Sequence, residues 1–142
     1  MKEEKISDEH QACVRAFDLD ISTKFAVEIS HHLRYRQLSK AKKILSEVIS
    51  QKKAIPFRRY NRDLGHKPGQ ASARYPIKAS KVILKLLEQL EANSEFKGLD
   101  TNYLVISKMV ANVGSTSWHF GRKRRRRAKK TNLEIFALEK KT

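Results

Sequence analysis

The chain has 142 residues, with 31 Lys and Arg against 15 Asp and Glu, and its formal net charge is +16. This length suits a single domain with a hydrophobic core of its own. The basic excess predicts a polyanionic partner, whereas no apolar run approaches the ~20 residues that span a bilayer. The single cysteine, Cys13, excludes an internal disulfide and fits a reducing compartment.

The N-terminal part is expected to hold a disordered segment followed by a weak strand. Residues 1–11 show no apolar periodicity, so we expect the single folded domain to comprise residues 12–142. An imperfect alternation indicates the first strand and places these side chains on one face: Cys13, Arg15, Phe17, Leu19 and Ile21.

Three helices are expected from apolar stripes at helical spacing. The first begins near Ser22 or Thr23 and the second near Ser39, since these residues can cap a helix start. The third begins just after Pro76 and ends near Asn93–Ser94. Its stripe is the most regular of the three and consists of Ala79, Val82, Ile83, Leu86, Leu87 and Leu90.

Two further segments, residues 103–111 and 133–138, are rich in strand-forming side chains. Residues 112–132 join them. If this is one hairpin, each arm runs about ten residues beyond the sheet, roughly 30 Å at ~3.3 Å per residue. The predicted fold is therefore α+β, with three helices packed on a small three-stranded antiparallel sheet and a long extended β-hairpin.

Residues 54–76 form a predicted loop that interrupts these patterns with several Pro and Gly residues. A loop of this length inside a compact domain is usually either functional or disordered. Phe57, Tyr60 and Tyr75 alternate with arginines, a mixture that stacks on bases and holds phosphates. Any one of these aromatic side chains could equally anchor the loop to the domain.

Residues 122–130 hold eight Lys or Arg in nine positions, between the two expected strands. Alone, such a run would fit a solvated or nuclear-import segment equally well. The flanking strands favour RNA contact, because they would hold the run at the tip of a folded hairpin. Arginine suits this role, since its guanidinium pairs with phosphate and stacks on bases. Trp118 and His119 either stack on RNA or pack at the hairpin bend.

No arrangement typical of catalysis or of metal binding is present in the sequence. Glu88, Glu91 and Glu95 have helical spacing and indicate a solvated, salt-bridged helix face. Residues 65–69 lack the spacing of a phosphate-binding P-loop. His31 and His32 are adjacent and point to different faces of the expected helix, so we expect no metal and no cofactor.

Several stretches together resemble one protein family, and the resemblance extends from about Ala16 to Glu139. It is the universal large-subunit ribosomal protein family numbered twenty-two in bacteria and archaea and seventeen in eukaryotes. The match is to the archaeal and eukaryotic branch and lies in residues 16–22, 55–61, 65–67, 74–81 and 91–100. The expected tip departs from the family, because residues 114–119 are shorter and lack a proline, and residues 124–130 are more basic.

The resemblance implies a structural constituent of the large ribosomal subunit, located in the cytoplasm, that binds and organises large-subunit ribosomal RNA. It also implies a hairpin that reaches the wall of the nascent-peptide exit tunnel. The expected partners are ribosomal RNA, neighbouring large-subunit proteins and the nascent peptide near the tip, with no membrane and no DNA. The candidate RNA-binding residues are Arg58, Arg59, Tyr60, Arg62, His66, Lys67, Arg74, Lys78, Lys81, Trp118, His119, Arg122, Lys123, Arg124, Arg125, Arg126, Arg127, Lys129 and Lys130.

The main alternative is a sequence-independent DNA-compacting protein, which would share the basic charge. Such a protein usually dimerises, and no apolar stripe remains for a dimer once the core is built. A nuclear chromatin factor is suggested by the arginine-rich run alone. A nucleic-acid-modifying enzyme would need catalytic groups that the sequence lacks, so we expect no enzymatic activity.

Overall fold

The computed structural model describes residues 11–140. The predicted disordered segment 1–11 therefore lies outside the described residues, apart from Gln11, which begins the first strand. The helices and strands in chain order are β1 (Gln11–Leu19), α1 (Thr23–Leu33), α2 (Leu38–Ile49), β2 (Ile55–Pro56), β3 (His66–Lys67), β4 (Ala71–Arg74), α3 (Ile77–Phe96), β5 (Leu104–Val113) and β6 (Thr131–Glu139).

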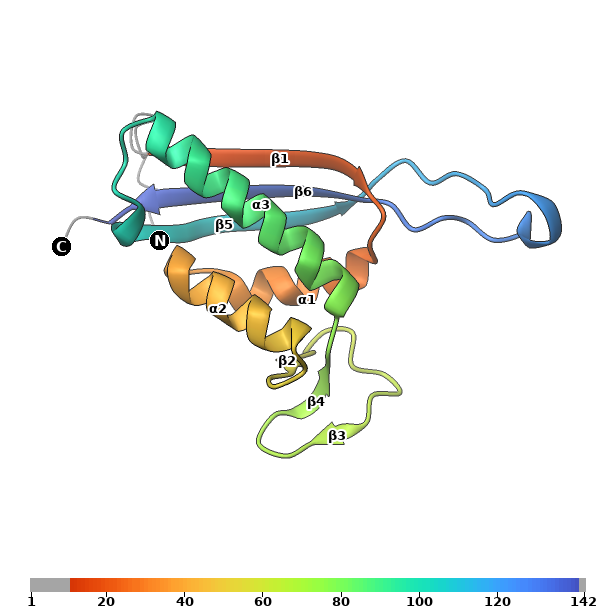
Figure 1. Cartoon of the computed structure of the whole chain (residues 1–142). Helices are drawn as coiled ribbons and strands as arrows, with labels where there is room; N and C mark the ends of the chain where they lie inside the picture. Colours follow the sequence, from red (N-terminus) through yellow and green to blue (C-terminus); the bar gives the residue numbers. More distant parts are fainter. Residues whose placement is uncertain (1–10, 141–142) are drawn as a thin grey trace, which may run out of the picture.

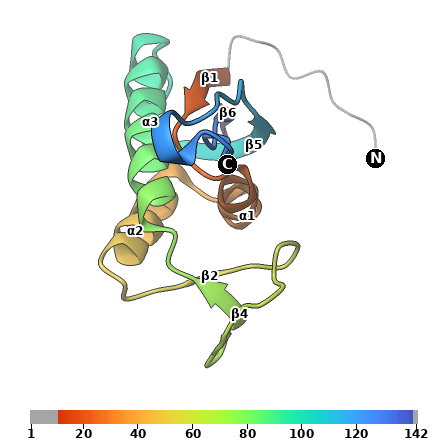
Figure 2. The ribbon, with the colours of Figure 1, turned by 90° about the vertical axis from the view of Figure 1, so that its right-hand side faces the viewer.

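The main sheet has three antiparallel strands in the order β1-β6-β5 (Figure 1). Helices α1 and α3 lie on the same face of this sheet, and α2 packs against α3 (Figure 2). The core lies between these layers and includes Leu33, Leu87 and Ile135, all fully buried. The predicted α+β fold of three helices on a three-stranded antiparallel sheet is therefore confirmed.

The helices bury the stripes that the sequence predicts. On α2 the buried side chains are Leu38, Ala41, Ile44, Leu45 and Val48. The helix begins at Leu38 rather than beside a Ser39 cap, since the buried Leu38 side chain holds its first turn in the core. Helix α3 ends at Phe96, slightly later than predicted, and Gly98 follows it at φ +71°. None of the helices within residues 11–140 is long and apolar enough to cross a membrane.

The first strand, predicted from an imperfect alternation, is present as β1, and its core-facing side chains are not the ones that showed the alternation. Ala12 and Val14 are buried, whereas Cys13, Arg15 and Phe17 are exposed. The register with β6 explains this, because Ala12 lies opposite Ala137 and Val14 opposite Ile135, both of which face the helices. Alternation alone cannot choose between two faces when the outward one also carries Phe17.

Residues 54–76 are more regular than the predicted loop, since they contain a second small sheet in the order β2-β4-β3. Ile55 pairs with Arg74, and Lys67 pairs with Ala71. The turn between β3 and β4 contains Gly69 at φ +73°, a backbone conformation that glycine adopts without strain. We call residues 54–76 the basic loop, and this name includes the small sheet.

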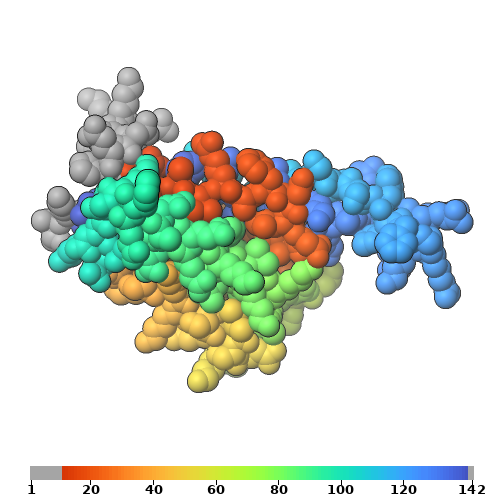
Figure 3. Space-filling view, turned by 45° about the horizontal axis from the view of Figure 1, so that its top comes forward, coloured from red at the N-terminus to blue at the C-terminus, as the bar shows by residue number. Residues whose placement is uncertain are grey.

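Beyond the main sheet the chain continues as a narrow two-armed extension, residues 114–130 (Figure 1). Regular pairing ends at Val113 and Thr131, so the sheet reaches further than predicted and the extension is shorter. Its arms are joined by backbone hydrogen bonds from Gly114 to Lys130 (2.9 Å) and from His119 to Arg126 (2.9 Å). A 3-10 turn, Gly121–Lys123, closes the tip, which projects from the body in Figure 3.

Candidate nucleic-acid interface

The basic loop is fastened to α1 by one buried carboxylate. Glu28 is only 1% exposed, and its side chain accepts backbone N–H groups from three successive loop residues. The donors are Arg58 at 3.1 Å, Arg59 at 2.8 Å and Tyr60 at 2.7 Å. Because their backbone is held by Glu28, the Arg58 and Arg59 side chains are left exposed to solvent.

Phe57 provides a second anchor for the basic loop. It is 3% exposed and packs edge-on against Phe25 of α1, with the ring centroids 5.2 Å apart. The ring therefore belongs to the core and is not accessible to a base. Of the two roles considered for the aromatic residues of the loop, Phe57 therefore has the anchoring one.

Cations lie over the remaining aromatic rings of this region. Lys24 and Arg59 both lie 5.7 Å from the Tyr60 centroid, and Arg74 lies 5.7 Å from that of Phe25. Lys67 lies at the same distance from Tyr75. Such contacts hold long basic side chains in place without neutralising their charge. Lys24 is not among the candidate residues predicted from the sequence, where its only local signal is its place in the first turn of a helix.

The tip and the returning arm of the extension carry the basic run 122–130. Residues 122–127 are all exposed, and Arg127 places its guanidinium 4.6 Å from the centre of the Trp118 ring. Trp118 and Arg127 form an isolated antiparallel bridge, so their side chains lie on the same side of the extension. No described acidic side chain forms a salt bridge with this run.

The two basic segments meet around the start of α1. Three adjoining grooves, of about 520, 450 and 570 Å³, meet pairwise at this point. The first and second share Ser22, the first and third share Phe25, and the second and third share Lys24 and Tyr60. Their volumes lie within the ~300–1,000 Å³ typical of ligand sites. Asp20 and Asp63 are the acidic side chains that line them. The basic ones are far more numerous and come from α1, the loop, α3 and the extension: Lys24, Arg59, Arg62, Arg74, Lys78, Arg126, Arg127, Lys129 and Lys130.

Lys78 differs from the other predicted contacts because it has an acidic partner. Its ammonium group donates to Asp20 at 2.5 Å, and both side chains are exposed. The Lys78 hydrogen bond and charge hold the pKa of Asp20 below its usual value. Part of the Lys78 charge is thus already compensated at the first groove.

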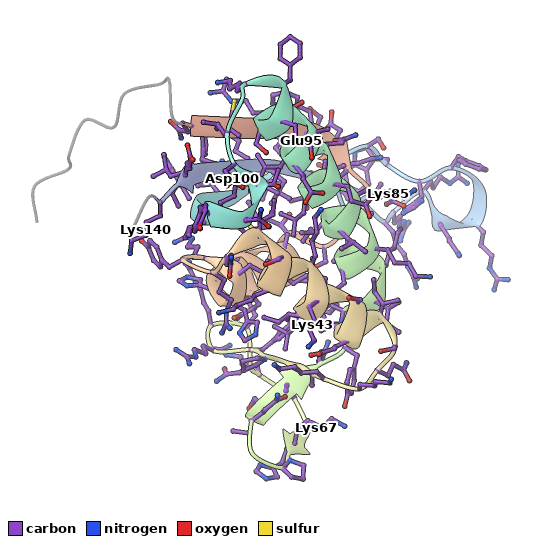
Figure 4. The ribbon with its side chains drawn as sticks, turned by 60° about the vertical axis from the view of Figure 1, so that its left-hand side comes forward. Lys43, Lys67, Lys85, Glu95, Asp100 and Lys140 are labelled. Atoms are coloured by element: carbon purple, nitrogen blue, oxygen red, sulfur yellow. The ribbon has the colours of Figure 1, made fainter. Side chains whose placement is uncertain are left out.

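Not every predicted residue lies at these grooves. Arg58 and His66 line a separate hollow at the outer side of the basic loop, and Lys81 is exposed on α3 outside all the grooves. Lys67, which is labelled in Figure 4, is held beside the Tyr75 ring. The predicted residues that the structure brings together at the grooves are Arg59, Tyr60, Arg62, Arg74, Lys78, His119, Arg126, Arg127, Lys129 and Lys130.

Comparison with known proteins gives the family. The family model described as "Ribosomal protein L22p/L17e" matches residues 14–136, which include both basic segments. The chain belongs to this family. Family membership confirms the predicted resemblance, and it identifies a structural ribosomal protein rather than an enzyme.

Curated L22p/L17e relatives match over nearly the whole chain. "Large ribosomal subunit protein uL22" of Thermoplasma volcanium is 42% identical and covers 93% of both chains. The Thermoplasma acidophilum protein of the same name is 43% identical over 92% of this chain and 89% of its own. That of Nanoarchaeum equitans is 41% identical over 96% of this chain and 83% of its own. The extension lies within the residues that the family model matches.

His32 of α1 is a half-buried imidazole that lines a small hollow together with Arg58 of the basic loop. Within residues 11–140, its Nε2 atom is buried without a hydrogen-bond partner. Burial, together with the charges of Arg36, Lys53 and Arg58, lowers the pKa of His32 to about 4. The ring is therefore neutral at physiological pH. No group of three His, Cys, Asp or Glu within the described residues could hold a metal ion.

We expect the fold to lose stability below pH 6.5 because of His32. The unfolded chain protonates this ring near pH 6.5 and the folded chain only near pH 4, so the unfolded state binds more protons between these values. Since the ring is partly exposed, we expect a loss of about 1 kcal/mol at pH 5 relative to pH 7. Urea unfolding at pH 5 and at pH 7 measures this difference in the free energy of unfolding.

The variant His32→Gln should remove this part of the pH dependence. The matched control is His31→Gln, which removes an imidazole from the exposed neighbouring position. An equal pH dependence in wild type and His32→Gln would contradict the expectation.

Proposed function

We propose that this chain is a structural constituent of the large ribosomal subunit that binds and organises large-subunit ribosomal RNA. The observation that carries the proposal is the meeting of the basic loop and the extension at the start of α1. A surface built from segments so far apart in sequence can hold two RNA segments at a fixed spacing. Helices and sheet serve as the rigid support.

The chemistry of this surface suits RNA backbone and bases together. Lysine and arginine contacts to phosphate position the protein and supply much of the affinity, while RNA shape supplies specificity. Arg59, Arg74 and Lys24 are already held over aromatic rings, so less side-chain entropy is lost on binding. Glu28 contributes indirectly by holding the backbone of the loop.

We further propose that the extension reaches the wall of the nascent-peptide exit tunnel. The support is its narrow projection from the body, the family to which the chain belongs, and its basic surface, which could pass through RNA. Neighbouring large-subunit proteins would then contact the exposed faces of the body, and a growing peptide would pass near the tip. The relatives are named as large ribosomal subunit proteins, which agrees with this location.

Sedimentation of the tagged chain from a lysate tests the proposal. The chain should co-sediment with the large subunit in a sucrose gradient and stay there after a moderate-salt wash. Retention is expected because contacts from two distant segments to one folded RNA dissociate slowly, unlike non-specific charge contacts. Release by the wash, or co-sedimentation with DNA, would instead indicate association by charge alone and favour the DNA-compacting alternative.

A further inference from the structure

The extension exposes two aromatic side chains that the core does not use. Trp118 is 59% exposed and Phe120 is 93% exposed. A single exposed apolar residue is common on protein surfaces and means little. Here both rings lie on a segment that is otherwise polar or basic, directly before the run 122–130. Their chemical surroundings, rather than their exposure, indicate what they bind.

Trp118 has a defined neighbour although it lies outside the core. The Arg127 guanidinium lies 4.6 Å from the ring centre. The two residues are fixed opposite each other by backbone hydrogen bonds on either side, from Ala128 to Ser117 (2.8 Å) and from His119 to Arg126 (2.9 Å). The indole therefore has a cation against its ring while more than half of its surface remains in solvent.

The ligand that fits this arrangement has a flat aromatic face and carries negative charge. Arg127 is itself surrounded by basic side chains, so a phosphate group is attracted to the same place as the ring. An unpaired nucleotide offers both features at once, since its base stacks on aromatic side chains and its phosphate pairs with arginine. An ordinary peptide segment offers no comparable charge.

We propose that Trp118 stacks on an unpaired RNA base, with Arg127 lying against the other side of the indole and Phe120 providing a second stacking contact. This inference rests on the proposed RNA-binding function and names the kind of RNA element that the tip recognises. Paired bases are excluded, because in a duplex they are stacked on each other and A-form RNA has a deep, narrow major groove.

Trp118 is the only tryptophan of the chain, so its fluorescence reports on this site alone. We would titrate the full chain with an oligoadenylate of about twelve nucleotides, within the usual range of single-strand binding sites. The matched ligand is a ribose-phosphate chain of equal length without bases. Oligoadenylate should quench the Trp118 emission, and the base-free chain should bind without quenching it.

Variants separate stacking from charge. Trp118→Ala should weaken oligoadenylate binding about 5- to 100-fold, as expected for a lost stacking contact, and leave binding of the base-free chain unchanged. Trp118→Phe should restore most of the affinity, because an aromatic ring is kept. Phe120→Ala should weaken binding, whereas Phe96→Ala, which removes an equally exposed ring (94%) from the end of α3, should not.

The outcomes distinguish this inference from the proposed function. If the wild-type chain bound neither ligand, RNA binding itself would fail. If both ligands bound equally, with constant emission and no effect of Trp118→Ala, RNA binding would stand and the stacking inference would be overturned. Equal quenching by an unstructured acidic peptide would also overturn it, since the tip would then be a peptide-binding site.

Discussion

Replacing Glu28 with Ala should destabilise the protein by about 3–5 kcal/mol, the amount typical of breaking a buried network of charge-assisted hydrogen bonds. The substitution leaves the N–H groups of Arg58, Arg59 and Tyr60 without their acceptor and opens a gap beside α1. Urea unfolding measures the stability loss. Amide hydrogen exchange at Arg59 and Tyr60 should accelerate more than exchange in β6.

A matched control separates this contact from a general effect of removing a carboxylate. Glu88 is exposed on α3, so Glu88→Ala should change stability by less than about 0.5 kcal/mol. Glu28→Gln should lose an intermediate amount of stability. Its amide oxygen can still accept a hydrogen bond from the loop, whereas its NH₂ group would face other N–H donors. If Glu28→Ala were as stable as Glu88→Ala, the carboxylate would not hold the loop.

Replacing Arg124, Arg125 and Arg126 together with Gln should weaken RNA binding and make it less dependent on salt. Each lost phosphate contact should lower the slope of log affinity against log salt by about 0.7 to 0.9, so the triple variant should lose about 2 to 3. The fold should not change, because all three side chains are exposed at the tip. Titration with large-subunit ribosomal RNA at several salt concentrations measures the slope.

The control removes the same charge from another part of the surface. Lys40, Lys43 and Lys140 are exposed, and Lys140 follows the end of β6 that lies opposite the extension (Lys43 and Lys140 are labelled in Figure 4). Their replacement with Gln should leave the slope nearly unchanged. If the salt slope fell equally in the two triple variants, net charge rather than the extension would govern binding.

The sequence alone was sufficient for features that depend on near neighbours. The apolar stripes of α2 and α3 repeat at helical spacing, and most of their side chains are buried, whereas Val82 of α3 is only half-buried. The two strands of the hairpin were recognised from local composition, and their ends differ from the prediction by only a few residues. The basic run 122–130 is itself a property of the sequence.

The face of β1 and the order within the basic loop depended on pairing between distant segments. Residues Ala12 and Val14 face the core because of their register with β6, more than a hundred residues away. The short strands β2, β3 and β4 carry too few residues to show a periodic pattern. No local signal distinguishes such a segment from an irregular loop.

The helices, the principal strands, the family and the basic character of residues 54–76 and 122–130 could all be inferred from the order of the amino acids. How these parts combine became visible only in the folded chain. Folding buried Glu28 as the acceptor for the loop, withdrew Phe57 into the core and brought Lys24 between the two basic segments. The physical reason is that charge and periodicity are local along the chain, whereas burial and contact arise when distant segments pack together.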